Sequence, residues 1–407
     1  MARVVFLHPD LGIGGAERLV VDAALALKNK GHDVHFITTH HDEDHCFVET
    51  KNGRLSVTVV GDWLPRHIFG RFYAVCTYIR MIYAALYIVF FSVIPPDIVF
   101  CDLVSVCIPF LRMSNAKVLF YCHFPDQLLS QPGGTLKALY RAPLNWLEEV
   151  TTGQADKILV NSKFTSGVFK NTFKKLKVIP DVLYPSMNTV PFDKTIPLPL
   201  NKILLKPLPE DAFIFLSINR YERKKNLKLA IEAMSEMRKH IPTTDWDRAH
   251  LVIAGGYDKR VRENIEYHEE LFLHAESSGF GEKVTFLKSP SDKAKMSLLS
   301  HCHCLIYTPP NEHFGIVPIE AMYAGKPVIA ANSGGPTETV VNDSTGFLCD
   351  LNPKDFAVAM TKFIQDEEMR EKFGEAGKAR MKKLFSFEAF SNQLETIVNN
   401  LLDTKTD

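Results

Sequence analysis

Two glutamates, eight positions apart, are the side chains of this sequence most suited to chemistry. Glu312 and Glu320 stand on either side of Gly315 and Pro318, after a strand-like apolar run. Proline is favoured in the first turn of a helix, so the pattern predicts a strand, a turn and a helix that begins near Ile319. Free amides at a helix start attract anions such as phosphate. On one helix the two carboxylates would lie about 12 Å apart along the axis, too far to share a proton but suited to gripping two ends of a ligand.

A charged turn after the apolar run 213–218 offers two cations. It contains Arg220 and Lys225, ahead of a helical pattern that begins at Leu227. Arginine presents a fork of N–H groups to phosphate oxygens and lysine presents a point charge, so the pair could meet over one diphosphate. A charged turn is more often simply solvated, and this motif alone leaves the two interpretations at even odds.

Gly14 and Gly15 lie in a turn between the apolar run 4–7 and a helical pattern that closes at Gly31. Strand, glycine-rich turn and helix open many nucleotide-binding α/β units. The next apolar run, 34–37, is followed by threonines, so the acid that binds ribose in dinucleotide sites is missing. Paired glycines let a backbone approach a phosphate or a sugar, and an ordinary tight turn is an equal alternative for this motif.

His123 follows one of several strand-like runs in the first half of the chain. These runs alternate with helical segments, which predicts a mainly parallel sheet with its ligand beyond the carboxyl ends of the strands. His123 therefore points to the same rim as Gly14 and Gly15. There it can hold a sugar hydroxyl or assist proton transfer, and a histidine hydrogen-bonded in a loop is the alternative. The runs lie at 4–7, 34–37, 56–60, 97–101, 118–122 and 158–160.

A second α/β domain is predicted after a proline-rich stretch, because 407 residues are too many for one ordinary core. One of its strand-like runs ends at Gly255. The runs lie at 213–218, 251–254, 284–287, 304–307, 327–330 and 346–348, and helical patterns follow at 353–365, 368–383 and 388–402. The expected organisation is a Rossmann-like domain at 1–184, a linker at 185–210, a second Rossmann-like domain at 211–385, and a C-terminal helix at 386–407 that packs back on the first domain.

Composition and cysteine usage narrow the functional class. Hydrophobic residues make up 46% of the chain and charged residues 23%, which suits a packed enzyme. The 47 basic residues balance the 47 acidic ones, so net charge gives no support for nucleic-acid binding. The eight cysteines form no CxxC pair and the start of the chain lacks a signal-peptide pattern, so we expect reduced thiols in a cytosolic environment. The alternation of His and Cys at 301–304 would place these side chains on opposite faces of a strand, and we expect no metal site.

The most lipophilic stretch of the chain is 72–94. It reaches the length of about 20 apolar residues that a bilayer crossing needs, but Arg80 interrupts it. A crossing would also separate the strands predicted on either side. We therefore expect a helix of the first domain whose aromatic face docks at the lipid interface, with basic residues toward anionic headgroups, and a fully buried core helix is an equal alternative. The basic residues are Arg66, His67, Arg71 and Arg80.

The order of these motifs is itself informative. Over nearly its whole length the chain resembles the retaining glycosyltransferases of the GT-B type, in which two Rossmann-like domains face each other across a cleft. The likeness is carried by Gly14-Gly15-Ala16-Glu17, His123, Arg220 with Lys225, Glu312 with Glu320, and Ser333-Gly334-Gly335-Pro336. Within that family, the segments 7–12, 61–66, 120–126, 182–186, 217–226 and 311–318 are similar to the endoplasmic-reticulum mannosyltransferases that extend lipid-linked oligosaccharides.

The resemblance implies substrates and a location. The donor is GDP-mannose and the acceptor is Man-GlcNAc2-diphosphate-dolichol, extended by an α-1,3 and then an α-1,6 mannose for N-glycosylation. The enzyme is expected at the cytoplasmic face of the endoplasmic reticulum membrane, in contact with membrane lipid and with other mannosyltransferases of the pathway. We expect no cofactor and no metal, because cations and helix-start amides can stabilise the leaving diphosphate and no DxD-like element stands in a suitable place.

The roles known in the family transfer to the matching positions. Arg220 and Lys225 would bind the donor diphosphate and stabilise the leaving GDP. Glu312 and His123 would contact the transferred mannose, and Glu320 would hold ribose hydroxyls. Glu312 is a weak candidate for a covalent nucleophile, since it has no obvious paired carboxylate at glycosidase-like separation. The expected catalytic residues are His123, Glu312, Arg220 and Lys225, and the expected donor-binding residues are Gly14, Gly15, Arg220, Lys225, Gly255, Glu312, His313, Phe314, Gly315, Ile316, Val317 and Glu320.

Two alternatives stay open from the sequence. A nucleotide-sugar epimerase, or another enzyme on the same double fold, would share the donor site. A scaffold protein could keep the fold without activity, and the intact motifs make this the less favoured alternative.

Overall fold

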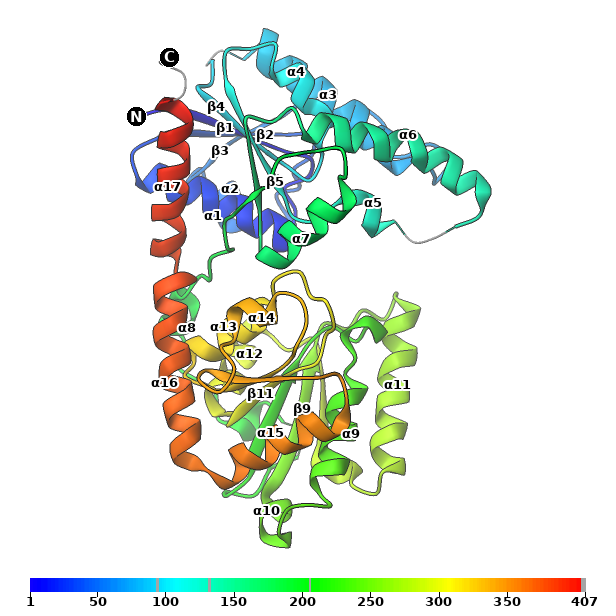
Figure 1. Ribbon diagram of the computed structural model, residues 1–407, viewed down its shortest axis with the longest axis vertical. Helices are drawn as coiled ribbons and strands as arrows, with labels where there is room; N and C mark the ends of the chain where they lie inside the picture. Colours follow the sequence, from blue (N-terminus) through cyan, green and yellow to red (C-terminus); the bar gives the residue numbers. More distant parts are fainter. Residues whose placement is uncertain (93–94, 131–132, 205, 404–407) are drawn as a thin grey trace. The chain divides into compact units, whose positions relative to one another are not determined.

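Two separate parallel sheets organise the chain in the computed structural model, which describes residues 1–92, 95–130, 133–204 and 206–403 (Figure 1). Unit 1 comprises Met1–Ser186 together with the segment from Phe387 onward, and unit 2 comprises Met187–Ser386. The chain therefore leaves unit 1 once and returns to it for its last helix.

Unit 1 is built on a seven-stranded parallel sheet with the order β3-β2-β1-β4-β5-β6-β7. β4 lies between β1 and β5, so the carboxyl ends of these three strands are adjacent. The strands are β1 (Arg3–His8), β2 (Asp33–Thr38), β3 (Ser56–Val59), β4 (Ile98–Asp102), β5 (Lys117–Cys122), β6 (Lys157–Val160) and β7 (Asp181–Val182). The helices are α1 (Gly15–Asn29), α2 (Val48–Lys51), α3 (Tyr73–Phe90), η1 (Ser105–Cys107), α4 (Ile108–Leu111), α5 (Asp126–Leu129), α6 (Thr135–Thr152), α7 (Lys163–Thr172) and α17 (Phe387–Asp403).

Alternate residues of β1 enter two different cores. Val4 and Phe6 pack on the side of α1, and Val5 and Leu7 pack on the side of α3. This period of two is expected for a strand buried on both faces. The sheet is therefore the middle layer of unit 1, with helices on either side of it (Figure 1).

The C-terminal helix α17 packs against α1 within unit 1 (Figure 1). Phe390, Leu394 and Val398 recur at helical spacing and join the core beneath α1. His32 and Glu395 form a hydrogen bond beside this contact, with 2.8 Å between Nε2 and Oε2. A helix from the end of the sequence thus completes the first core.

Unit 2 is built on a six-stranded sheet with the order β10-β9-β8-β11-β12-β13, again parallel. The strands are β8 (Phe213–Ile218), β9 (Ala249–Gly255), β10 (Val284–Lys288), β11 (Cys304–Tyr307), β12 (Val328–Ala331) and β13 (Gly346–Cys349). The helices are α8 (Val190–Lys194), η2 (Leu200–Lys202), η3 (Arg223–Lys225), α9 (Lys228–Met237), α10 (Thr243–Arg248), α11 (Arg262–Ser277), η4 (Gly281–Lys283), α12 (Asp292–His301), α13 (Ile316–Tyr323), α14 (Pro336–Thr339), α15 (Pro353–Gln365) and α16 (Glu367–Leu384).

The α/β class with two parallel sheets, predicted from the sequence, is confirmed. Helix α13, however, begins at Ile316 and not near Ile319. Gly315 has a φ of +83° and turns the chain into the helix earlier than the position of Pro318 indicated. Proline is tolerated in this first turn because the amide it lacks would have no partner within the helix.

The proline-rich stretch 185–210 is more structured than the expected linker, since it contains α8 and η2. The Tyr323 hydroxyl donates a hydrogen bond to Asp193, and the amide of Leu198 donates to Ser297 Oγ at 2.9 Å. Most of this stretch therefore packs as part of unit 2.

The lipophilic stretch 72–94 contains α3, and residues 93–94 lie outside the described part of the chain. Arg80 is buried, at 4% relative exposure. It donates to the carbonyl oxygen of Thr39 and to Asp62 Oδ1, the latter at 2.9 Å. The expectation that Arg80 faces lipid headgroups is therefore wrong, because a buried guanidinium needs such partners to offset its desolvation.

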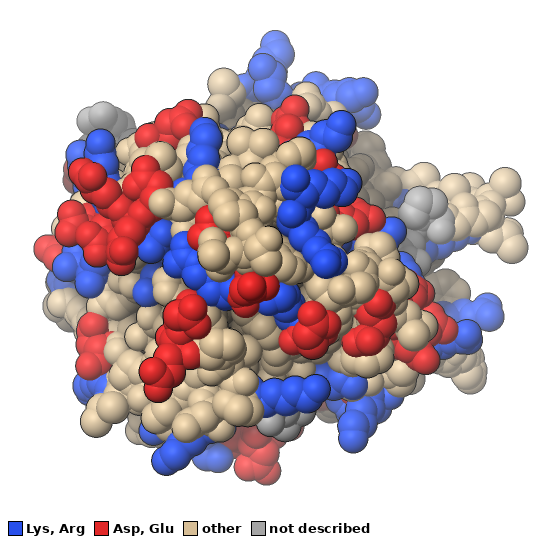
Figure 2. All heavy atoms as spheres, turned by 90° about the horizontal axis from the view of Figure 1, so that it is seen from below, with Lys and Arg blue, Asp and Glu red and all other residues tan. Residues whose placement is uncertain are grey.

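Acidic and basic side chains are interspersed over the face of the molecule shown in Figure 2. This distribution agrees with the equal totals of 47 basic and 47 acidic residues. A single-sign field that would steer a polyanion is not a feature of that face.

Candidate active site

Lys225 and Glu312 form an ion pair at the carboxyl ends of the strands of unit 2. Lys225 ends η3, which follows β8, and Glu312 lies in the loop between β11 and α13. The Lys225 ammonium donates to Glu312 Oε2, and the Tyr307 hydroxyl donates to the same oxygen at 3.3 Å. Thr308 Oγ1 donates to the carbonyl oxygen of Lys225 at 2.9 Å and ties this turn to the end of β11. Backbone and side-chain contacts therefore fix both partners.

The Glu312 carboxylate keeps its negative charge although it is partly buried. Burial disfavours the charged form, but the charge and hydrogen bond of Lys225 lower the pKa of Glu312 below its usual range. The Lys225 side chain is only 12% exposed. A cation with so little water around it interacts more strongly with an anion than one in bulk solvent. Burial together with the charge of Glu312 raises the pKa of Tyr307, so its hydroxyl stays protonated and donates.

Two consecutive glycines hold the Glu312 loop in position. Gly334 has a φ of +66°, and a Cβ at this residue would stand 2.5 Å from the carbonyl oxygen of Glu312. A Cβ at Gly335 would stand 2.3 Å from the carbonyl oxygen of Phe314. The amide of Gly335 also donates to the carbonyl oxygen of Glu312 at 2.7 Å. The two glycines of the Ser-Gly-Gly-Pro motif therefore allow this segment to pack directly against the backbone of the Glu312 loop.

Gly315 precedes the first turn of α13 and has the left-handed conformation that favours glycine. A Cβ at this position would stand 3.3 Å from the Tyr307 ring. No side chain among the described residues caps this helix start. Ile316 is exposed and Val317 half-buried, so the first turn lies at the surface of unit 2 with its amides available to an anion.

His313 and Phe314 differ in what they can present to a ligand. Phe314 is buried, and its ring meets that of Phe385 with 5.8 Å between centroids. Only the backbone of Phe314 can therefore take the expected donor-binding role. His313 is half-buried in the same loop.

Glu320 is paired with a lysine that the sequence analysis did not single out. Lys295, on α12, donates to Glu320 Oε1. The other oxygen, Oε2, is buried and has no hydrogen-bond partner in the described part of the chain. Burial raises the pKa of Glu320 although the Lys295 charge opposes that shift. A buried acceptor without a partner is costly, so this oxygen is suited to a ligand hydroxyl.

Arg220 points toward solvent at the end of β8. Its side chain is 61% exposed and pairs with Glu222, with 2.9 Å between NH1 and Oε1. A Cβ on Gly255 would stand 1.7 Å from the carbonyl oxygen of Asn219, so only glycine fits where β9 passes the residue before Arg220. Packing therefore requires glycine at position 255, and the role of Gly255 in donor binding stays a prediction. No described contact joins Arg220 to Lys225.

The glycine turn of unit 1 lies at the carboxyl end of β1. Gly14 precedes α1 in an extended conformation, with Glu17 folded over it. A Cβ on Gly15 would meet no described atom within 4 Å. Internal packing therefore does not require glycine at position 15, which leaves space for a ligand to approach the backbone there.

His123 is held by a buried carboxylate from the neighbouring strand. Asp102, at the end of β4, lies between two histidines: its Oδ1 is 2.7 Å from His8 Nδ1 and its Oδ2 is 2.9 Å from His123 Nε2. The amide group of Asn161 donates to the carbonyl oxygen of His123 at 3.0 Å. His8 also lies 3.7 Å from Glu17. The rim of unit 1 therefore carries a connected set of polar, titratable side chains.

Sequence reasoning missed four residues that contact the predicted ones. His8 and Asp102 each end a strand, which is the position where parallel sheets place functional groups, but each looked like the polar end of an apolar run. Tyr307 looked like a core residue of a strand. Lys295 stands in a helix with several exposed charges, and no local signal separates it from them.

The His and Cys residues at 301–304 do not lie on one strand. His301 ends α12, and only Cys304 belongs to β11. His303 Nδ1 accepts a hydrogen bond from the amide of Ile214 at 3.0 Å. In the described residues, no group of three or more His, Cys, Asp or Glu side chains could hold a metal ion.

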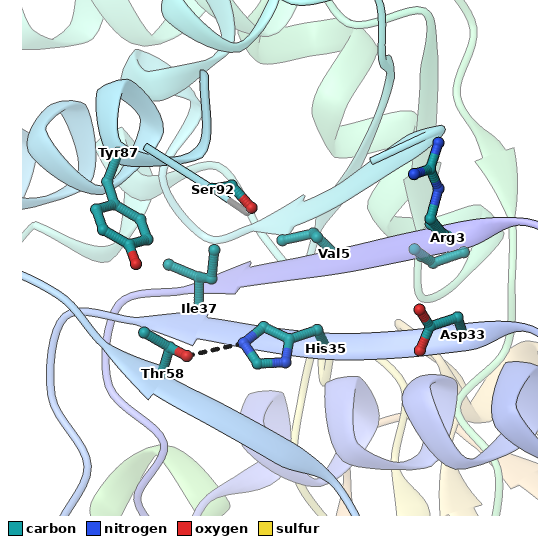
Figure 3. A pocket seen from close by; sticks show the side chains of 9 residues that line it. Arg3, Val5, Asp33, His35, Ile37, Thr58, Tyr87 and Ser92 are labelled. Carbon is teal, nitrogen blue, oxygen red and sulfur yellow. Dashed lines mark hydrogen bonds between the residues drawn. The ribbon is translucent and has the colours of Figure 1, made fainter. Parts of the chain in front are cut away.

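A cavity of about 210 Å³ lies elsewhere in unit 1, against the first residues of β1 and β2 (Figure 3). Its polar lining includes His35, whose Nε2 lies 2.8 Å from Thr58 Oγ1, as the dashed line in Figure 3 marks. Burial lowers the pKa of His35. None of the predicted site residues lines this cavity, which therefore is not the candidate active site.

Two parallel sheets, a lysine–glutamate pair, a second glutamate and a helix start that no described side chain caps are the features expected of a glycosyltransferase. Comparison with family models agrees: residues 13–182 match the model for Glycosyltransferase Family 4, and residues 205–380 match the model for Glycosyl transferases group 1. Among solved structures, sucrose-phosphate synthase from Thermosynechococcus elongatus shares the fold, with a TM-score of 0.76 at 21% identity, covering 99% of this chain and 100% of that one. The GT-B fold class predicted from the sequence is confirmed.

Relatives of similar length show which family of glycosyltransferases the chain belongs to. The chain is 54% identical to alpha-1,3/1,6-mannosyltransferase ALG2 of Homo sapiens over 98% of this chain and 96% of the relative. It is 49% identical to the protein of the same name from Dictyostelium discoideum, over 98% of each chain. The chain belongs to the family of the alpha-1,3/1,6-mannosyltransferases.

Proposed function

We propose that this chain transfers mannose from GDP-mannose to Man-GlcNAc2-diphosphate-dolichol, first through an α-1,3 and then through an α-1,6 linkage, in the lipid-linked oligosaccharide synthesis that supports N-glycosylation. The observation that carries the proposal is the partly buried Lys225–Glu312 pair, in a chain 54% identical to a human alpha-1,3/1,6-mannosyltransferase. The guanosine of the donor and the dolichol of the acceptor rest on the resemblance of the motifs.

The groups of unit 2 suit a nucleoside-diphosphate sugar. Lys225 and Arg220 supply positive charge for the diphosphate, and the amides at the start of α13 supply further donors. Glu320 offers a ribose hydroxyl its buried Oε2, which has no hydrogen-bond partner among the described residues. Glu312, ionised and held by Lys225 and Tyr307, accepts hydrogen bonds from hydroxyls of the mannose.

The chemistry follows from the charges that develop. Breaking the bond between sugar and phosphate puts positive charge on mannose and negative charge on GDP. Fixed cations and amides stabilise the negative charge without reorganising during the reaction. We assign this role to Lys225 and Arg220 and propose a reaction without a metal. Retention of configuration then follows from attack by the acceptor hydroxyl on the face from which GDP departs.

We further propose, from the resemblance of the motifs, that His123 contacts the transferred mannose and that Gly14 and Gly15 leave room for the donor. His123 is 16% exposed and Gly15 has open space above its backbone. These features support a ligand-facing role for the rim of unit 1, on the side where parallel sheets bind ligands.

We place the enzyme on the cytoplasmic face of the endoplasmic reticulum membrane, docked through the region of α3. Among the described helices, α3 is long and apolar enough to cross a membrane, with a mean hydropathy of 1.5 over 18 residues, of which 39% are buried. One side of α3, including Met81 and Ala85, lies in the core of unit 1, and the buried Arg80 ties it to Asp62. A crossing would break these contacts, which favours docking over spanning.

The exposed apolar surface extends from α3 to α6. Phe72 and Tyr140 join the two elements, with 5.5 Å between their ring centroids. Phe90 and Phe91 extend it at the far end of α3. Large exposed apolar patches mark interaction sites, and aromatic side chains are favoured at lipid interfaces. Further exposed members are Phe69, Tyr73, Ile79, Tyr83, Leu136 and Leu139.

The proposal is tested by incubating the purified protein with labelled GDP-mannose and Man-GlcNAc2-diphosphate-dolichol. Label in the lipid-linked fraction is expected. Conversion of GDP-mannose to another nucleotide sugar, with no label on the lipid, would indicate an epimerase. Absence of any reaction in protein that still binds GDP would indicate a scaffold that kept the fold.

A further inference from the structure

His8, Asp102 and His123 form a row across three adjacent strands of unit 1. The parallel register places Leu7 beside Cys101, and Asp102 beside Tyr121. His8 therefore ends β1, Asp102 ends β4, and His123 stands one residue after β5. Each oxygen of the Asp102 carboxylate meets one imidazole nitrogen, at 2.7 Å from His8 Nδ1 and 2.9 Å from His123 Nε2.

His8 and Asp102 are more deeply buried than His123. The side chains of His8 and Asp102 are each 1% exposed, and that of His123 is 16% exposed. Only His123 can meet a ligand. The ring of Tyr121 packs on the His123 ring with 4.7 Å between centroids, and Asn161 binds the His123 carbonyl oxygen, so the imidazole is held from several sides.

The chemistry of a carboxylate assigns the protons. An ionised carboxylate only accepts hydrogen bonds, so each imidazole nitrogen that faces Asp102 carries a hydrogen. His123 thus holds its proton on Nε2, and Nδ1 is the nitrogen left for a ligand. His8 donates through Nδ1, and its Nε2 lies 3.7 Å from Glu17 Oε1. A buried carboxylate is otherwise costly, and two donors offset that cost.

The electrostatics agree with this assignment. Burial opposes the charge on His8, but the attraction and hydrogen bond of Asp102, with those of Glu17, raise the pKa of His8 to about 10. Burial likewise opposes the charge on Asp102, but His8 and His123 lower its pKa. His8 and Asp102 are therefore both ionised near neutral pH and neutralise each other in the interior.

We infer that Asp102 and His8 are positioning residues for the transfer reaction: Asp102 fixes the ring of His123 with the proton on Nε2, so that Nδ1 meets a hydroxyl of the transferred sugar, and His8 keeps Asp102 charged. This inference rests on the proposed function, since it assigns His123 to the sugar. Neither Asp102 nor His8 touches the substrate.

A kinetic cycle separates this role from a general structural one. Asp102→Asn is expected to lower kcat about 10- to 100-fold with little change in the KM for GDP-mannose, because the ring is misoriented while the diphosphate contacts persist. In the His123→Ala background, adding Asp102→Asn is expected to change kcat less than about twofold, since the residue through which it acts is gone. Equal losses in both backgrounds would overturn the inference.

Asp156→Asn is the matched control. The Asp156 carboxylate accepts the amide of Val118 at 2.8 Å, near the opposite end of β5. The substitution changes a hydrogen-bonded carboxylate beside the same sheet without contacting His123, and kcat is expected to stay within about twofold of the wild type. A loss in this variant as large as in Asp102→Asn would mean that both act through stability, and would overturn the inference.

The wild-type protein gives a second readout that does not depend on a variant folding. Nitrogen-15 NMR of histidine-labelled protein, with the His123 signals assigned by comparison with His123→Gln, is expected to show a proton on Nε2. A neutral ring with its proton on Nδ1 would overturn the inference. If the proton is on Nε2 but His123→Ala transfers mannose at the wild-type rate, the tautomer stands and it is the assignment of His123 to the sugar in the proposed function that fails.

Discussion

The Lys225 ammonium and the Glu312 carboxylate are paired although 87 residues separate them in the sequence. The neighbouring Lys224 behaves differently: its side chain is 69% exposed and pairs with Glu222. Two adjacent lysines in one charged turn therefore have distinct environments. One has its charge beside the proposed sugar-binding carboxylate, and the other is solvated.

Replacing Lys225 tests which of these lysines serves the reaction. Lys225→Ala is expected to lower kcat about 10²- to 10³-fold, because a fixed cation is lost where negative charge develops on the leaving GDP. Lys224→Ala is the matched control and is expected to remain within about twofold of the wild type, as is usual for an exposed pair. The measurement is the rate of mannose transfer at saturating GDP-mannose. Similar activity in the two variants would remove Lys225 from the site.

Lys295 offers a test of donor binding apart from chemistry. It pairs with Glu320, and its loss would leave a buried carboxyl that takes up a proton and accepts less well from a ribose hydroxyl. Lys295→Met is expected to raise the KM for GDP-mannose about tenfold with a smaller effect on kcat. Lys293→Met, on the exposed side of the same helix, is the control. A lower kcat with an unchanged KM would contradict the assignment of Glu320 to the ribose.

Gly255 predicts a stability effect from geometry alone. A Cβ would stand 1.7 Å from the carbonyl oxygen of Asn219, and backbone cannot move aside as a side chain can. Gly255→Ala is expected to lower the free energy of unfolding by about 3 kcal/mol. Gly167→Ala, in α7 with no described atom within 4 Å, is expected to raise it by about 0.5–1 kcal/mol. Urea unfolding measures the free energy of unfolding of both variants. An unchanged value in Gly255→Ala would show that β9 is not held against Asn219.

The buried carboxyl of Glu148 is expected to make the stability of the protein depend on pH. Its two oxygens accept the amides of Asp126 and Gln127, just after His123, at 2.6 and 3.1 Å. Burial outweighs these bonds and raises the pKa of Glu148 from an ordinary 4.5 to about 7. Between these values the folded state keeps a proton that the unfolded state has lost, so this group lowers the free energy of unfolding as pH rises, by up to about 1.4 kcal/mol per pH unit.

The variant Glu148→Gln removes that titration. Its free energy of unfolding, relative to the wild type, is therefore expected to rise between pH 5 and pH 7 and then to level off. Other titrating groups cancel in this difference. A difference that stays flat, or falls, over this range would show that Glu148 is ionised throughout.

The exposed apolar surface of α3 and α6 is expected to bind lipid. Ile79 and Phe90 are exposed and stand eleven residues apart, about three turns, so they lie on one side of α3. Replacing both with Asp is expected to reduce flotation with anionic lipid vesicles at least about tenfold, since charges at an interface oppose insertion. Phe272 and Leu273, exposed on α11 of unit 2, provide the matched control when replaced with Asp. Equal loss in both double variants would place the lipid contact elsewhere or make it non-specific.

The sequence predicted the layers of the fold well because its strands are short apolar runs at regular intervals. Val4 and Phe6 face one core and Val5 and Leu7 face the other, so both faces of β1 are buried and this run is apolar throughout. The start of α13 was misplaced because a proline is tolerated anywhere in a first turn. The position of Gly315 in the left-handed region set the start instead.

Residues of the candidate site could be predicted from the sequence where the residue type itself suits the chemistry, as a lysine suits a phosphate. Glu312 and Lys225 were both expected at the donor site, one for the mannose and the other for the diphosphate, and the structure joins them in an ion pair. Asp102 was missed because its importance comes from strand order: β4 lies between β1 and β5, and no local pattern shows that. Arg80 was misassigned because a charge in an apolar run looks exposed, whereas Asp62, in the segment that precedes α3, pairs with it.

The mass of the glycan released from the lipid tests the central claim most directly. After incubation of Man-GlcNAc2-diphosphate-dolichol with excess GDP-mannose, the wild-type protein and Lys224→Ala are predicted to give a product larger by two hexoses, and Lys225→Ala to leave the acceptor unchanged over the same time. Release of GDP with no change in the mass of the glycan would contradict the account.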